Sequence, residues 1–180
     1  ALDAIEANLG IINVLINNAG VAASKHCGKV NESDWDFTME TNLKGVWRVA
    51  NGVVKRLLAA KQGGSIVNIA SILGLRVGFG ESNYCISKAG VLQMTKSMGL
   101  ELGTKGIRVN ALCPGYFKTE INDTFFDSEA GQAYIDKMPA KRLGELNELN
   151  VPLLLLASEA GSFMNGAAIP VDGGHLNSSL

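Results

Sequence analysis

Tyr84 and Lys88 stand four residues apart in the sequence, a spacing that places both side chains on one face of a helix. A tyrosine phenol has an ordinary pKa of about 10, which makes it a poor acid or base at neutral pH. A lysine ammonium beside the phenol would favour the phenolate and bring its pKa toward the working range. The pair therefore indicates general acid/base chemistry, although the same spacing also occurs often by chance.

Ser71 gives this pair a structural context. It directly follows an apolar run that predicts a strand over 65–70, while Asn17-Asn18-Ala19-Gly20 and Pro114-Gly115 follow two other such runs. Ligands of open parallel sheets bind outside the carboxyl ends of the strands. Three strands are therefore expected to bring polar or glycine-rich groups to one rim, and packing alone does not require that arrangement.

The elements that must position these groups follow from hydrophobic periodicity. The pattern predicts strands over 14–16, 65–70, 107–112 and 167–171, and helices over 2–9, 34–61, 82–102 and 145–158. Ser33 and Asp36 predict the N-terminal cap of the second helix, and Pro170 places the last strand at a sheet edge. The alternation predicts βαβ units and an α/β fold with a Rossmann-like, doubly wound parallel sheet in one domain.

The composition limits the class of protein. The 180 residues are 47% hydrophobic and 18% charged, with a net charge of −1, which is typical of a globular protein with a sizeable core. No basic excess points to nucleic acid, and no apolar run reaches the roughly 18 residues of a membrane span. Cys27, Cys85 and Cys113 lack the spacing of metal ligands, so we expect no metal site. With no signal peptide either, we expect a cytoplasmic protein.

Together the motifs resemble those of the short-chain dehydrogenase/reductase family. The run Asn17 to Gly20, Asn42, Ser71, Tyr84-x-x-x-Lys88 and Pro114-Gly115 with Thr119 occur in the order and spacing of that family, and Pro170-Val171-Asp172-Gly173-Gly174 closes the match. The resemblance covers essentially the whole chain. In type it is similar to the 3-oxoacyl-(acyl-carrier) reductases and the sugar or polyol dehydrogenases of the family.

The resemblance implies hydride transfer between NAD or NADP and a small-molecule alcohol or carbonyl substrate. Tyr84 would protonate a carbonyl oxygen or deprotonate an alcohol, and Ser71 would orient that oxygen. Lys88 would lower the pKa of Tyr84 and bind the nicotinamide ribose, and Asn42 would hold a water that relays protons from Lys88. Taken alone, Asn42 is more simply a polar residue of an amphipathic helix.

The resemblance also implies how the cofactor and substrate are held. Besides Tyr84 and Lys88, the cofactor would be bound by Asn17, Ala19 and Gly20 toward the adenosine side and by Pro114, Gly115 and Thr119 at the nicotinamide end. Asn17 could equally cap backbone groups at the end of its strand. The segment of about 116–142 would form a lid over the substrate, and core packing of its aromatic residues is the alternative.

The Gly-rich turn with which the family seats the cofactor pyrophosphate does not occur in the sequence. We therefore expect roughly the C-terminal two-thirds of a single domain, with a sheet that is incomplete at its N-terminal side. Two functions stay open: an NAD(P)-dependent oxidoreductase, or a truncated, catalytically silent chain that keeps only its oligomerisation surfaces. In the family the helices here over 34–61 and 82–102 pack against their copies, which implies a homotetramer or dimer.

Overall fold

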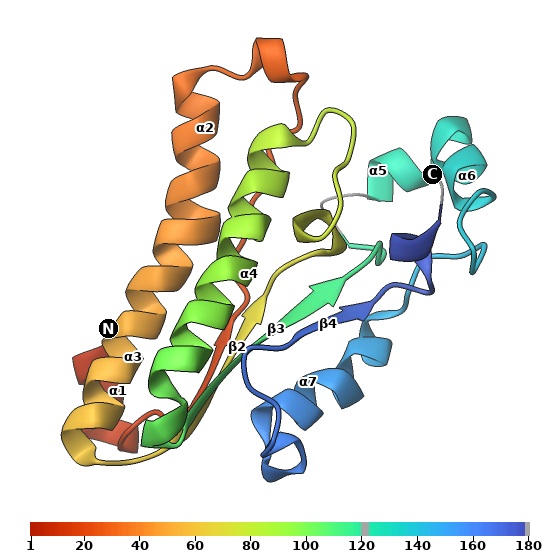
Figure 1. Cartoon of the computed structure of the whole chain (residues 1–180). Helices are drawn as coiled ribbons and strands as arrows, with labels where there is room; N and C mark the ends of the chain where they lie inside the picture. Colours follow the sequence, from red (N-terminus) through yellow and green to blue (C-terminus); the bar gives the residue numbers. More distant parts are fainter. Residues whose placement is uncertain (120–122, 179–180) are drawn as a thin grey trace.

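A computed structural model describes residues 1–119 and 123–178 of the chain. At its centre is a parallel sheet of β1 (Val14–Asn17), β2 (Gly64–Ile69), β3 (Ile107–Pro114) and β4 (Ala168–Val171), in the spatial order β1-β2-β3-β4 (Figure 1). Every neighbouring pair is parallel, so each connection must cross over the sheet. The predicted α/β fold with a Rossmann-like parallel sheet is confirmed.

Helices make these crossovers. The α-helices are α1 (Leu2–Leu9), α2 (Glu32–Met39), α3 (Val46–Ala60), α4 (Ser82–Leu102), α5 (Asp123–Phe126), α6 (Glu129–Ile135) and α7 (Asn150–Ala157). A π-helical segment, η2 (Glu40–Gly45), joins α2 to α3. Short 3-10 turns are η1 (Cys27–Lys29), η3 (Ile72–Gly74), η4 (Gly103–Lys105), η5 (Leu146–Leu149), η6 (Glu159–Gly161) and η7 (His175–Asn177).

Helices cover both faces of the sheet. Ile66 of β2 and Val109 of β3 pack in one cluster with the buried side chains of α3. The adjacent strand residues Val67 and Leu112 pack instead against Leu156 of α7. Because side chains alternate along a strand, α3 and α7 must lie on opposite faces, and Figure 1 shows α4 beside α3. The two inner strands β2 and β3 are almost completely buried, because helices cover them on both faces.

The strand register brings the carboxyl ends to one rim. Asn17 is opposite Asn68 and Ile69 is opposite Leu112, while Pro114 at the end of β3 is opposite Val171. The loops that follow β1, β2 and β3 therefore leave the sheet at the same edge, as predicted. The strand with Pro170 is an edge strand, which confirms the expectation from its missing N–H group.

Several predicted boundaries differ from the structure. The single helix expected over 34–61 is α2, η2 and α3 in succession. Its cap is formed by Asn31 and Asp34, not by Ser33 and Asp36: the Asn31 side chain accepts from the Asp34 N–H at 2.9 Å, and the Asp34 carboxylate accepts from the Asn31 N–H at 3.2 Å. The capping chemistry and its three-residue spacing were right, but it begins two residues earlier.

The segment expected as a lid contains two short helices, α5 and α6. Its residues 120–122 lie outside the described part of the chain. Among the described helices, none combines the length and the apolar character that crossing a bilayer would require.

Candidate active site

Ser71 and the helix that carries Tyr84 and Lys88 meet at the carboxyl rim. Ser71 follows β2 and begins η3, where its hydroxyl accepts the Leu73 N–H at 3.1 Å. Gly74 ends η3, and a Cβ at this position would lie 2.9 Å from the carbonyl carbon and oxygen of Lys88. The missing side chain therefore allows the turn that bears Ser71 to pack directly on the backbone of α4.

Lys88 is almost completely buried, with 3% of its surface exposed. Its ammonium donates to the Ile69 carbonyl at 2.9 Å and lies 5.6 Å from the centroid of the Tyr84 ring. Burial disfavours the charged amine and lowers the pKa of Lys88 to about 8, an effect that charge interaction with Cys113 opposes. The ammonium is thus held at the end of β2, below the rim.

Tyr84 lies beside Ser71 and Lys88, but its pKa is raised, whereas a lowered pKa was expected. Burial raises the pKa of Tyr84, and a hydrogen bond with the Ser71 side chain opposes this rise without cancelling it. Desolvation of the phenol is the largest effect on this pKa, and no lowering by Lys88 accompanies it in this arrangement. Tyr84 is therefore protonated at neutral pH in this structure.

Asn42 is fully buried in the π-helical segment, and its side chain is committed to protein partners. Its amide nitrogen donates to the Val21 carbonyl at 2.8 Å and to the Ser87 hydroxyl at 3.1 Å, and its oxygen accepts the Val21 N–H at 2.8 Å. The side chain thus clamps the loop after β1 to α4. π-Helical segments are frequent at functional sites.

Ser87 is a site residue that the sequence analysis missed. It is buried, accepts from Asn42 and donates to the Tyr84 carbonyl at 2.8 Å. Its place directly before Lys88, on the helix that carries the acid/base pair, was the signal available in the sequence.

The loop after β1 has a buried and an exposed part. The Asn17 amide donates to the Asn68 side chain at 2.9 Å, and Asn68 in turn donates to Thr95 at 2.9 Å. Asn17 is therefore tied into the core through side chains, and the capping of backbone groups that was left open for it is not among these bonds. Ala19 and Gly20 are exposed at the rim, and a Cβ on Gly20 would lie 3.5 Å from both the Lys88 ammonium and the Asn42 amide oxygen.

The end of β3 forms another part of the rim. Pro114 ends the strand, and Gly115 donates its N–H to the Val171 carbonyl at 2.9 Å. Thr119 is half-buried and directly precedes the residues that are not described. Since β3 pairs with β2, Pro114 and Gly115 lie at the end of the strand next to the one that Ser71 follows.

Tyr116 connects the lid segment to this group. The centroid of its ring lies 5.5, 5.7 and 5.4 Å from those of Phe126, Tyr134 and His175. Tyr116 and Tyr84 both pack against the cluster that contains Ile72. Since Phe126 is buried, core packing describes this segment well in the present conformation.

The described residues contain no group of three or more histidine, cysteine or acidic side chains that could hold a metal ion. A cavity of about 100 Å³ lies beside Tyr116 and His175.

A parallel sheet with helices on both faces and a polar rim at its carboxyl ends defines a Rossmann-like α/β protein. Residues 1–175 match a family described as enoyl-(acyl carrier protein) reductase. The chain is 38% identical over 165 residues to a 3-oxoacyl-[acyl-carrier-protein] reductase of Thermotoga maritima, covering 92% of this chain and 66% of that protein. It is 37% identical over 176 residues to a 2-dehydro-3-deoxy-D-gluconate 5-dehydrogenase of Escherichia coli, covering 97% and 70%.

A solved gluconate 5-dehydrogenase from Burkholderia cenocepacia, in complex with NADP and tartrate, superposes with a TM-score of 0.94 at 35% identity, covering 99% of this chain and 70% of that one. The chain belongs to the short-chain dehydrogenase/reductase family of oxidoreductases. It spans about two thirds of the length of the curated relatives it matches.

Proposed function

We propose that the protein is an oxidoreductase that transfers a hydride between NAD or NADP and a small-molecule alcohol or carbonyl compound. The observation that carries this proposal is the meeting of Ser71, Tyr84 and Lys88 at the carboxyl rim, with the serine side chain bonded to the phenol. The family relationship supports the reaction class.

In this proposal Tyr84 is the general acid and base. It gives its proton to the carbonyl oxygen during reduction and takes a proton from the alcohol during oxidation. The raised pKa of Tyr84 keeps the phenol protonated at neutral pH, so the phenol holds the proton that the reduction consumes. Ser71 holds the reacting oxygen next to the phenol. Lys88 remains close enough to the ring to stabilise a phenolate when one forms, and Asn42 fixes the geometry around both.

The cofactor supplies the hydride when it is bound, and the chain supplies position. A Cβ on the exposed Gly20 would lie 3.5 Å from the Lys88 ammonium, so the missing side chain leaves room there for a ribose with hydroxyl groups. We assign cofactor binding to Asn17, Ala19, Gly20, Tyr84, Lys88, Pro114, Gly115 and Thr119, the side chain of Asn17 acting mainly through the structure of its loop. Neighbouring structures of the family contain NADP or NADH.

We further propose that residues 1–180 belong to one domain in which the segment 116–142 closes over the substrate. The names of the relatives suggest sugar acids and acyl thioesters as the first substrate classes to test. Cys27, Cys85 and Cys113 are free thiols, which supports a reducing compartment such as the cytoplasm.

The test is a spectrophotometric assay of the purified chain with NADH and NADPH against a panel of keto sugar acids and 3-oxoacyl thioesters. We expect turnover with at least one pair, and a loss of about 10²-fold or more in Tyr84→Phe, because general acid catalysis contributes on that order. Equal turnover in wild type and Tyr84→Phe would refute the role of the phenol.

A second candidate is a catalytically silent chain that retains only its association surfaces. It is favoured by one observation, that the 180 residues contain no Gly-rich turn of the kind that seats a dinucleotide pyrophosphate. A binding measurement separates the candidates. NADH or NADPH is added to the chain, and binding is detected as quenching of the fluorescence of the two tryptophans. Saturable binding supports the oxidoreductase, and the absence of both binding and turnover supports the silent chain.

A further inference from the structure

Asn83 precedes Tyr84 and has no exposed surface. It is the second residue of α4, where backbone N–H groups have no partner within the helix. Its side-chain oxygen accepts the Tyr84 N–H at 3.0 Å. Asn83 therefore satisfies an otherwise unpaired donor in the turn that presents the phenol.

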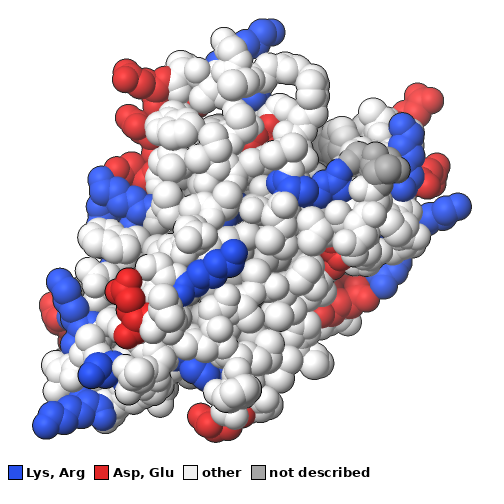
Figure 2. Space-filling model, in the orientation of Figure 1, with Lys and Arg blue, Asp and Glu red and all other residues white. Residues whose placement is uncertain are grey.

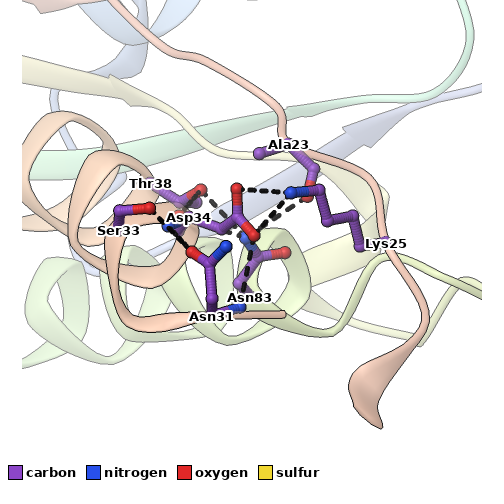
Figure 3. Close-up of polar contacts among 7 residues, drawn as sticks. All are labelled: Ala23, Lys25, Asn31, Ser33, Asp34, Thr38 and Asn83. Carbon is purple, nitrogen blue, oxygen red and sulfur yellow. Dashed lines mark hydrogen bonds and ion pairs between the residues drawn. The ribbon is translucent and has the colours of Figure 1, made fainter. Parts of the chain in front are cut away.

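The other end of the Asn83 amide reaches two further segments. Its nitrogen donates to the Thr38 hydroxyl at 3.0 Å and approaches the carbonyls of Ala23 and Asp34 at 3.4 Å each (Figure 3). Thr38 itself donates to the Asp34 carbonyl at 2.9 Å. One buried side chain thus joins the first turn of α4 to α2 and to the loop after β1.

That loop is fixed to the same cluster by an ion pair. The Lys25 ammonium lies 2.7 Å from both carboxylate oxygens of Asp34, the residue whose N–H is capped by Asn31 (Figure 3). The hydrogen bonds with Lys25 and with the Asn31 backbone lower the pKa of the Asp34 carboxyl, so the carboxyl is ionised at neutral pH. Lys25 is partly exposed, so the ion pair alone contributes little, and the buried amide is the stronger link.

The carbonyl side of Tyr84 is held in a corresponding way. Ser87 donates to the Tyr84 carbonyl and accepts from Asn42, which binds both backbone groups of Val21. The N–H and the carbonyl of Tyr84 are therefore both anchored, and both anchors lead to residues of the loop that follows β1.

We propose that Asn83 is a positioning residue for Tyr84, which it couples to α2 and to the loop Val21–Lys25 through its buried amide. This inference rests on the proposed role of Tyr84. In this proposal Asn83 contacts neither the substrate nor the cofactor. It sets the depth at which the phenol is buried, and it makes that depth depend on the loop beside the cofactor-binding rim.

The direct readout is the titration of the Tyr84 phenol, followed by phenolate absorbance as the difference from Tyr84→Phe. The groups that act on this phenol are Ser71, Glu81 and Cys85, with Lys88 above the ring. In Asn83→Ala the first turn of α4 loses its anchor and water reaches the phenol. We expect the pKa of Tyr84 to fall toward its ordinary value, because less of the phenol is then desolvated.

Two variants separate positioning from general destabilisation. Thr38→Val removes the closest partner of Asn83 without touching Tyr84, and should shift the titration in the same direction by less. Asn110→Ala removes an equally buried amide of β3, which is bonded to Met164 and Ala167 and to none of the residues that anchor Tyr84. It should leave the Tyr84 titration unchanged. If Asn83→Ala does not fold, the Tyr84 titrations of Thr38→Val and Asn83→Ser are compared with those of the wild type and Asn110→Ala instead.

The proposal is overturned if Asn83→Ala titrates like the wild type, or if Asn110→Ala shows the same shift. Where the wild-type chain turns over, Asn83→Ala should lower kcat by about tenfold or more while the dinucleotide Kd changes by less than about twofold. A wild-type chain without turnover counts against the proposed function alone, because the phenol titration decides the role of Asn83 independently.

Discussion

At the scale of single residues, the chemistry depends on a half-buried phenol and a buried amine. The pKa of Tyr84 is raised and that of Lys88 is lowered, and burial is the first cause of both shifts. Burial therefore moves the two pKa values in opposite directions. The tyrosine is protonated at neutral pH, and the lysine beside it can release its proton near neutral pH. The phenol therefore holds the proton that the reduction of a carbonyl would consume.

Lys88 makes a prediction about stability and pH. Its pKa is about 8 in the folded chain and 10.5 for a free side chain, so between these values the unfolded chain binds a proton that the folded chain lacks. The free energy of unfolding should therefore rise with pH in that window. Below the window Lys88 is charged in the folded chain, and the burial of this charge lowers the free energy of unfolding by its full amount. Relative to Lys88→Met, the wild type should gain up to about 1.4 kcal/mol per pH unit. Urea unfolding at several pH values measures the difference, and parallel curves for the two proteins would contradict it.

At the scale of the elements, the close contact between η3 and α4 sets the distance between Ser71 and Tyr84. Ala at position 74 would place its Cβ 2.9 Å from the Lys88 carbonyl and 3.0 Å from Leu92. Because backbone atoms cannot yield as a flexible side chain can, we expect Gly74→Ala to destabilise the chain by about 1–3 kcal/mol. Chemical denaturation measures this loss.

Gly28→Ala is the matched control, since nothing lies within 4 Å of the Cβ it would add. Its effect should remain within about 0.5 kcal/mol. Equal stability of the two variants would show that the approach of η3 to α4 is looser than the structure has it.

Much of this arrangement could be predicted from the sequence. Apolar runs located all four strands, the helix over 82–102 was predicted with its observed bounds, and Pro170 identified the edge strand. The sequence could not predict the π-helical turn at Asn42 or the hydrogen bonds of Asn83, because both depend on contacts between segments far apart in the chain. The net effect of burial on Tyr84 was missed for the same reason: sequence spacing reveals a neighbouring lysine but not how much water surrounds the phenol.

At the scale of the whole molecule, apolar side chains remain exposed on the helical layer formed by α2, α3 and α4. Phe37 and Trp47 are 54% and 48% exposed, and Ile86 on α4 is 47% exposed. Charges of both signs lie around this layer, and the surface along α4 is mostly uncharged in Figure 2. We propose that these helices pack against a second copy of the chain, in a homodimer or tetramer, as the family resemblance implies.

Trp47→Glu tests that association. A carboxylate at the centre of an apolar contact would be desolvated without a partner, so we expect the mean mass in sedimentation equilibrium to fall toward that of one chain. Val151→Glu on α7, across the sheet, replaces a side chain that is 75% exposed and should leave the mass unchanged. A monomeric wild type, or an unchanged mass in Trp47→Glu, would contradict this assignment of the contact surface.

The central claim is that Tyr84 supplies the proton for a hydride transfer at the rim of the sheet. It is tested most directly by incubating the chain with nicotinamide cofactor deuterated at C4 and an accepted carbonyl substrate, and by mass spectrometry of the alcohol formed. We predict deuterium at the former carbonyl carbon with the wild type, and about 10²-fold less labelled product with Tyr84→Phe. Equal labelling by the two proteins, or reduction without transfer of the label, would contradict the claim.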